Sequence, residues 1–323
     1  LLAPVDAPDL TTAPSDLAPP PVLRCGAEPP PGALRAPAAP PYSGGTCPML
    51  VPGRNQLRST GHGRSLLLVV PKDLRPEERL PVIFLWHWLG GSAQEFLNKG
   101  EVQAAVDQQR FLAILPEAKS DMLFKWPFDV GVSNTRLEEE LRFFDDMLSC
   151  AEAQFNVDRD CVATAGVSAG ALFTDQLAGH RSQYLSSALS MSGGVGGFAR
   201  PFGPATHKLP FLALYGGDGD TCAGVINFKT ATLALEDELI RGGHFFLECV
   251  HNCGHAEPPF EGPMGMTKFA AMWQFVFDHP YWLGKGESPY KLGGVPKDLP
   301  AWCGIGKGSA KQRTGACPDK PGC

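Results

Sequence analysis

The 323-residue sequence lacks a long uninterrupted hydrophobic run, and no segment approaches the roughly 20 apolar residues that a membrane-spanning helix needs. It also lacks a cluster of basic residues: 28 lysines and arginines stand against 34 aspartates and glutamates. These absences argue against a membrane span and against an electrostatic surface for nucleic acid or anionic lipid. The first residue is not methionine, and we interpret the sequence as a trimmed form from which any export signal has been removed.

Cysteine, by contrast, is abundant: ten residues, an even number, are spread over the whole chain. Such a set in a proline-rich chain favours disulfides and an oxidising compartment, with reduced cytosolic thiols as the alternative. Proximity in sequence suggests three bonds, namely Cys25–Cys47, Cys150–Cys161 and one pair among Cys303, Cys317 and Cys323. We therefore expect a secreted, periplasmic or cell-envelope protein.

Composition divides the chain into three parts. Residues 1–45 contain twelve prolines, each of which removes a backbone donor, so this part is expected to be an extended linker or arm. Such a spacer would suit a tether to an envelope or to another module, and an arm packed on its own domain is the alternative. Residues 46–280 are expected to form the main domain. Residues 281–323, rich in glycine, proline and lysine, are expected to be a C-terminal extension stapled by disulfides.

Short apolar runs alternate with helical patterns within the main domain. The runs lie at 65–71, 80–88, 111–116, 161–166, 186–193, 210–217 and 244–250. The helical patterns lie at 102–109, 137–155, 171–179, 229–240 and 267–277. Strands that are apolar throughout and alternate with helices predict the α/β class, with a mainly parallel central sheet and helices on both faces.

A G-x-S-x-G pattern with Ser168 at its centre follows directly after one of these apolar runs. A strand can turn sharply into a helix with a serine at the tip only if small residues flank the serine, here Gly166, Ala169 and Gly170. This turn is the nucleophile elbow of α/β-hydrolases, and a helix-compatible stretch follows it. We therefore predict Ser168 as a nucleophile; a glycine- and serine-rich turn without chemistry is the alternative.

A serine hydroxyl needs a neighbouring base, and in this fold an acid and then a histidine follow it on loops after strands. One apolar run turns through glycines into Asp218 and Asp220, and the next leads to His251 and His255. We choose Asp220, because the glycines make the turn and leave this residue free to face the histidine, and Asp218 remains the alternative. His255 is chosen over His251 because it follows a glycine at a loop tip.

Acyl transfer also needs backbone donors aimed at the negative charge that develops on the substrate oxygen. We expect one donor from Ala169, directly after the serine. The second is expected from the loop after the run 80–88, which reads like H-G-x-G-G with Trp88 in place of the first glycine. The N–H of Trp88 and that of Leu89 are both candidates, and His87 is expected to fix this loop.

Three aromatic residues are candidate substrate contacts. Trp88 lies in the loop just described, and Trp126 and Phe128 lie in the long segment 117–135. Substrate contacts are often found in such loops. Packing in the core is the alternative for each of the three.

Cys249, His251, Cys253 and His255 alternate, so that in a strand all four would lie on one face. Two thiolates and two imidazoles could hold a zinc ion in a tetrahedral site. Ligands two residues apart on one short strand rarely converge on one ion, and we predict no metal site. We expect instead a Cys222–Cys253 disulfide that joins the acid loop to the histidine loop, with Cys249 as the alternative to Cys253.

The elbow sequence GVSAGALFT resembles that of secreted polyhydroxybutyrate depolymerases and bacterial feruloyl esterases. The segments LSMSGG, YGGDGDT and CGH resemble the strand after the elbow, the acid loop and the histidine loop of these families, and the match covers about residues 60–280. The resemblance implies an α/β-hydrolase that cleaves carboxylic esters outside the cytoplasm without a cofactor. Two departures are a tryptophan at position 88 and an alanine at position 171, where the families have glycine.

These observations together predict a secreted serine ester hydrolase that acts through an acyl-enzyme on a polyester, or on a feruloyl or acetyl ester. The expected partner is an ester substrate, polymers included, and neither nucleic acid nor a metal is expected to bind. The alternatives are a non-catalytic binding module on the same scaffold and a serine peptidase of the same fold.

Overall fold

A computed structural model of the chain describes residues 24–319 and 322, with the exception of residues 223 and 225. The strands of the main sheet are β1 (Gly53–Ser59), β2 (His62–Val69), β3 (Leu80–Trp86), β4 (Leu112–Pro116), β5 (Val157–Val167), β6 (Ser187–Met191), β7 (Phe211–Tyr215), β10 (Phe246–Val250) and β11 (Cys303–Ile305). A separate two-stranded ribbon consists of β8 (Thr221–Cys222) and β9 (Ile226–Asn227). The helices are α1 (Ala93–Lys99), α2 (Val102–Gln109), α3 (Asn134–Gln154), α4 (Ala169–His180), α5 (Phe228–Gly242), α6 (Ala270–Phe277) and α7 (Tyr290–Gly293).

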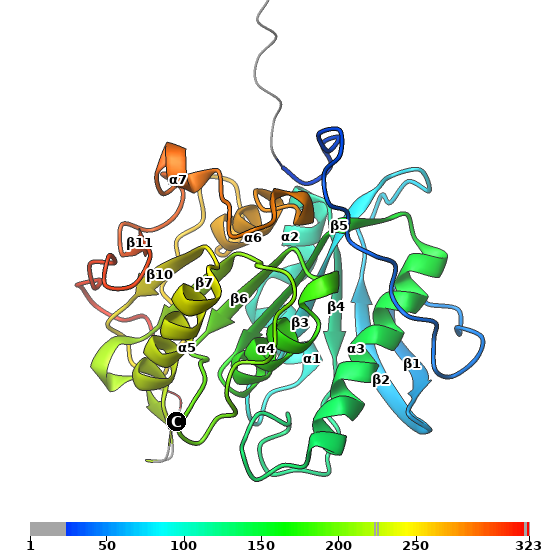
Figure 1. The fold of residues 1–323 in the computed structure, drawn as a ribbon, viewed down its shortest axis with the longest axis horizontal. Helices are drawn as coiled ribbons and strands as arrows, with labels where there is room; N and C mark the ends of the chain where they lie inside the picture. The colour runs from blue at the N-terminus through cyan, green and yellow to red at the C-terminus, as the bar shows by residue number, and fades with distance from the viewer. Residues whose placement is uncertain (1–23, 223, 225, 320–321, 323) are drawn as a thin grey trace, which may run out of the picture.

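The main sheet has nine strands in the order β1-β2-β4-β3-β5-β6-β7-β10-β11 (Figure 1). Neighbouring strands from β4 to β10 are parallel, whereas the pairs β1–β2, β2–β4 and β10–β11 are antiparallel. Each apolar run of the sequence overlaps one of these strands, and each helical pattern overlaps a helix. The predicted α/β class is therefore confirmed. Because parallel strands end at the same edge of a sheet, the loops after β5, β7 and β10 lie close together.

Helices cover both faces of the sheet, as the strands require. In β3, Phe84 and Trp86 belong to one buried cluster, which includes residues of α3, α4 and α5, whereas Ile83 and Leu85 belong to a second, which includes residues of α1, α2 and α6. Alternate side chains of a strand point to opposite faces, so a strand between two helix layers must be apolar throughout. None of the helices in the described part of the chain is long and apolar enough to cross a membrane.

The described part of the N-terminal arm packs on the main domain. Disulfides join Cys25 to Cys161 in β5 and Cys47 to Cys150 in α3. The backbone N–H of Ser43 also donates to Asp146 of α3, at 2.7 Å. The predicted bonds Cys25–Cys47 and Cys150–Cys161 are therefore wrong, because the arm lies along the domain and each of its cysteines bonds to a domain cysteine.

The C-terminal extension adds a strand to the sheet and is bonded to the histidine loop. Two disulfides join β10 and the loop after it to the extension: Cys249–Cys303 and Cys253–Cys317. A disulfide between two of Cys303, Cys317 and Cys323 was expected. For Cys303 and Cys317 this prediction is wrong, because each bonds to a cysteine outside the extension. Cys323 lies outside the described residues. The preferred Cys222–Cys253 bond is also wrong, although Cys222 is itself disulfide-bonded. Since Cys249 and Cys253 are both oxidised, neither can serve as a thiolate ligand of zinc.

Candidate active site

Ser168 lies between β5 and α4 in a strained backbone conformation, with φ 55° and ψ −119°. A non-glycine residue adopts a positive φ rarely, and such strain is typical of functional turns. The flanking glycines explain how the turn is possible. A Cβ atom on Gly166 would lie 2.2 Å from the carbonyl oxygen of Gly170, and one on Gly170 would lie 2.0 Å from that of Trp86. The expected need for small residues at this turn is confirmed.

Three side chains from three different loops form a continuous chain of hydrogen bonds. Nε2 of His255 lies 2.9 Å from Oγ of Ser168, and its Nδ1 lies 2.7 Å from Oδ1 of Asp220. These residues follow β5, β7 and β10, so the parallel order of the strands brings them to one edge of the sheet. The arrangement can move a proton from a serine hydroxyl to an imidazole that a carboxylate orients.

The Asp220 carboxylate is fully buried and accepts two further hydrogen bonds on its second oxygen. Oδ2 accepts from the backbone N–H of Gly216 at 2.7 Å and from the hydroxyl of Ser192 at 2.8 Å. Asp218, the alternative acid, is different: its side chain is 88% exposed and forms an ion pair with Lys229. The geometry therefore favours Asp220, which lies after the turn, over Asp218, which lies on its outer side.

The His255 ring is held from several directions. It stacks on the ring of Phe228, the first residue of α5, with 4.3 Å between the centroids and 9° between the planes. Its carbonyl oxygen accepts a bond from the N–H of Gly322 in the C-terminal extension at 2.7 Å. His251 is fully buried and its Nδ1 accepts from the N–H of Cys253; burial lowers its pKa to about 4. The structure thus places His255, and not His251, beside the serine.

His87 fixes the loop that carries Trp88. Its Nδ1 lies 2.9 Å from the carbonyl oxygen of Trp88, and its Nε2 accepts from the N–H of Ala118 at 3.3 Å. Burial lowers the pKa of His87, so the ring is neutral at neutral pH and Nδ1 carries the proton that it donates. The carbonyl of His87 accepts the indole N–H of Trp126 at 2.8 Å. Both peptide groups around Trp88 are therefore fixed.

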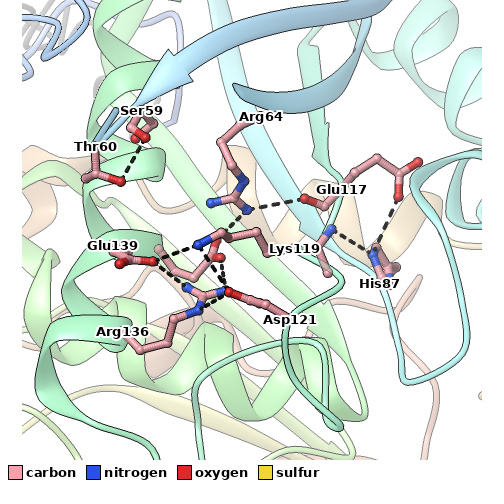
Figure 2. Close-up of polar contacts among 11 residues, drawn as sticks. Ser59, Thr60, Arg64, His87, Glu117, Lys119, Asp121, Arg136 and Glu139 are labelled. Atoms are coloured by element: carbon pink, nitrogen blue, oxygen red, sulfur yellow. Dashed lines mark hydrogen bonds and ion pairs between the residues drawn. The ribbon is translucent and has the colours of Figure 1, made fainter. Parts of the chain in front are cut away.

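His87 also contacts a polar network through Glu117 (Figure 2). Arg64 of β2 forms a buried ion pair with Glu140 of α3 at 2.8 Å and donates to the carbonyl of Glu117 at 3.3 Å. The carboxylate of Glu117 in turn lies 3.8 Å from Nε2 of His87. Arg136 completes the pairing of Glu140, at 2.7 Å. The network joins β2 and α3 to the segment after β4 and, through Glu117, to His87.

A cavity of about 550 Å³ opens onto Ser168 and His255. Its wall is largely apolar and includes Trp88, Leu89, Phe96, Met191, Phe269 and Trp273. Charged groups from Lys99, Glu257 and Asp319 also border it, and Nζ of Lys99 lies 5.1 Å from the Trp88 ring centroid. Its volume lies within the usual range for sites that hold a small organic ligand.

Two of the three aromatic residues expected to contact substrate lie elsewhere. Trp126 and Phe128 are fully buried in the core cluster and do not border the cavity. The Trp126 ring meets the Trp86 ring edge-on, with the centroids 5.1 Å apart. The expectation is corrected for both, because the loop that holds them folds inward against α4. Of the three expected residues, Trp88 alone borders the cavity.

Two residues that contact the triad, Ser192 and Phe228, were not predicted from the sequence. Ser192 lies near the end of the apolar run 186–193 and directly follows β6, a position at which polar side chains often serve a site. This position could have marked Ser192 as a candidate site residue. Phe228 begins a helix, and no sequence pattern distinguishes a phenylalanine that stacks on a catalytic ring from one in the core.

No protein-family model matches the sequence, and no curated protein matches it by sequence. Solved structures do match it. Native sOPH superposes with a TM-score of 0.65 at 18% identity, over 82% of this chain and 99% of its own. Native pOPH superposes with a TM-score of 0.63 at 15% identity, over 81% of this chain and 97% of its own. At such identities a structural match establishes the fold, and this chain therefore has the α/β-hydrolase fold that it shares with sOPH and pOPH.

Proposed function

We propose that the protein is a serine hydrolase of carboxylic esters, with Ser168 as nucleophile, His255 as general base and Asp220 as the acid that orients it. The observation that carries this proposal is the unbroken set of hydrogen bonds from Asp220 through His255 to Ser168, at 2.7 and 2.9 Å. The serine stands at a strained turn beside an apolar cavity, which is where an acyl group can bind.

The reaction follows from this geometry. His255 takes the proton of the Ser168 hydroxyl at Nε2 as Oγ attacks the ester carbonyl, and the buried Asp220 stabilises the imidazolium that forms. His255 then gives that proton to the departing alcohol, which leaves an acyl-enzyme. A water molecule, deprotonated by His255 in the same way, attacks the acyl-enzyme and releases the carboxylic acid.

Backbone N–H groups stabilise the oxyanion in both steps. Ala169 is the first residue of α4, so its N–H has no partner within the helix and lies at the positive end of the helix dipole. Trp88 and Leu89 both border the cavity that opens onto Ser168, and one of their N–H groups supplies the second donor. The bonds that fix the peptides around Trp88 keep this donor in place before substrate binds.

The apolar wall of the cavity supports a hydrophobic acyl group, and polyesters, feruloyl esters and acetyl esters remain the proposed substrate classes. No cofactor takes part in the proposed steps. The disulfides support a secreted or cell-envelope location, because such bonds persist in oxidising compartments. A tether through the proline-rich N-terminal residues belongs to the same proposal.

The direct test compares the purified protein with its Ser168→Ala variant on p-nitrophenyl acetate and butyrate. We expect turnover by the wild type and only background hydrolysis by the variant, with an unchanged circular dichroism spectrum. A fluorophosphonate probe should label the wild type at Ser168 and leave the variant unlabelled. Equal turnover by the two proteins would refute the proposed nucleophile, and failure of the probe to label the folded wild type would favour a binding module.

Rates on polyhydroxybutyrate film, methyl ferulate and p-nitrophenyl esters of rising chain length identify the acyl group. Matched amide substrates test the peptidase alternative, since a peptidase would cleave them without preference for esters. We expect cleavage of esters only.

A further inference from the structure

Ser192 directly follows β6 and has an unusual backbone conformation, with φ 53°. Its N–H donates to the carbonyl oxygen of Leu214 in β7 at 2.7 Å, so the residue is fixed between two strands of the sheet. Its hydroxyl donates to Oδ2 of Asp220 at 2.8 Å, and its side chain also borders the cavity at Ser168. Glycine or asparagine would adopt this conformation at lower cost, so the hydroxyl is the feature that a serine adds here.

Asp175, which is fully buried in α4, forms hydrogen bonds with the turn that carries Ser192. One oxygen of Asp175 accepts from the hydroxyl of Ser190 at 2.9 Å and from the N–H of Gly194 at 2.6 Å. A carboxyl group buried without an ion-pair partner is costly, and no cation pairs with Asp175 within the described part of the chain. Its two hydrogen bonds both go to residues that flank Ser192.

The same turn is packed too closely to shift. A Cβ atom on Gly193 would lie 2.1 Å from Oγ of Ser190 and 2.7 Å from Oδ2 of Asp175. From the other side, the hydroxyl of Thr232 in α5 donates to the carbonyl of Gly193 at 3.1 Å. The position of the Ser192 hydroxyl is therefore fixed by α4 and α5 together.

We propose that Ser192 is a positioning residue that holds the Asp220 carboxylate in the orientation in which its other oxygen meets His255, and that Asp175 holds the turn that presents Ser192. This inference rests on the proposed function. With the N–H of Gly216 and the hydroxyl of Ser192 both bonded to Oδ2, the carboxylate cannot rotate about its Cβ–Cγ bond, and Oδ1 is left to His255 alone.

The test compares Ser192→Ala and Ser192→Gly with the wild type by NMR titration of the His255 ring and by the pH dependence of kcat/KM. Alanine and glycine both remove the hydroxyl, but glycine relieves the backbone strain. Without the hydroxyl, Asp220 attracts the imidazole proton more strongly, so the pKa of His255 should rise by about half a unit. Since the base must be neutral, the acid limb of kcat/KM should move to higher pH by the same amount, and kcat should fall about tenfold.

Ser187→Ala is the matched control. Ser187 lies on β6, the strand that Ser192 follows; it is fully buried, and its hydroxyl has no hydrogen-bond partner within the described residues. Its removal should leave both the His255 titration and the acid limb unchanged.

An unshifted His255 titration in Ser192→Ala and Ser192→Gly would overturn the inference, even if kcat fell, because a merely structural role predicts loss of rate alone. A shift in alanine but not in glycine would also overturn it, since strain and not the hydroxyl would then be the cause. The titration needs no substrate, so a wild type without esterase activity would refute the proposed function while the Ser192–Asp220–His255 coupling is still decided.

Discussion

The N–H of Gly254 donates a hydrogen bond to the carbonyl oxygen of Gly216 at 3.0 Å, which joins the loop of the proposed base directly to the loop of the proposed acid. The two backbones are so close that a Cβ atom on Gly216 would lie 2.0 Å from the Gly254 carbonyl oxygen. The distance between Asp220 and His255 therefore depends on the absence of a side chain at position 216.

Gly216→Ala should consequently separate the two loops and disable the site. We expect kcat/KM on p-nitrophenyl butyrate to fall about a hundredfold, the loss that a displacement near 1 Å causes, and stability to fall by about 1–3 kcal/mol. Gly219→Ala is the control: it lies in the same loop, but its Cβ would meet only Cα of Gly254 at 3.7 Å, an ordinary contact. Equal activity of the two variants would show that the close approach has no role.

Removing the Cys253–Cys317 disulfide should affect both stability and catalysis. This bond ties the C-terminal extension to a residue two positions before His255, whereas Cys47–Cys150 ties the arm to α3. The double variant Cys253→Ser, Cys317→Ser should lose about 2–4 kcal/mol in urea unfolding and also lose kcat. The double variant Cys47→Ser, Cys150→Ser should lose similar stability and keep its kcat. Unchanged kcat in both would show that the extension does not hold the histidine loop.

The pH dependence of stability should depend in part on His207, which stacks on Tyr281 with the ring centroids 3.8 Å apart. Burial lowers the pKa of His207 to about 4. In the unfolded chain a histidine binds a proton below about pH 6.5, whereas His207 in the folded protein stays neutral down to about pH 4. The protonation cost of its burial is therefore nearly absent at pH 7 and grows as the pH falls from about 6.5 to 4.

His207→Phe should remove this cost while keeping the stacked ring. Relative to pH 7, the stability of the variant over the wild type should grow by up to about 2 kcal/mol at pH 5, measured by urea unfolding at each pH. A difference that does not change between pH 7 and pH 5 would contradict the assignment of acid sensitivity to this residue.

The buried ion pair between Arg64 and Glu140 gives a further test. Glu140→Gln removes the charge that compensates the buried Arg64 guanidinium, and we expect a loss of about 3 kcal/mol in urea unfolding. Glu139→Gln is the control, since Glu139 pairs with the less buried Lys119 at 3.1 Å and should contribute about 0–1 kcal/mol (Figure 2). A loss below 1 kcal/mol in Glu140→Gln would mean that the guanidinium finds compensation elsewhere.

Much of the fold could be predicted because its signals are local. Strands such as β3 and β7 are apolar throughout, and α3 places Leu137, Leu141 and Phe144 on one face. The proposed triad followed from the elbow pattern and the fixed chain order of its partners. These features need no knowledge of which distant segments meet.

The misses all depend on distant contacts or on weak local signals. β1 reads GRNQLRS, and as an edge strand it buries only alternate residues, so its apolar content is too low to be recognised. Disulfide pairing depends on which segments meet in space, and here each arm cysteine bonds more than 100 residues away, at separations of 136 and 103. The inward turn of the loop around Trp126 is likewise set by tertiary packing against Phe173.

The two arm disulfides also constrain the order in which the protein can be completed during synthesis. Cys25 must wait for Cys161 and Cys47 must wait for Cys150, so the arm cannot be bonded to the main domain until β5 and α3 have been made. An oxidant that acts earlier finds only Cys25 and Cys47 together, which the native protein does not join. Correct maturation therefore requires either late oxidation or an isomerase that can undo the early bond.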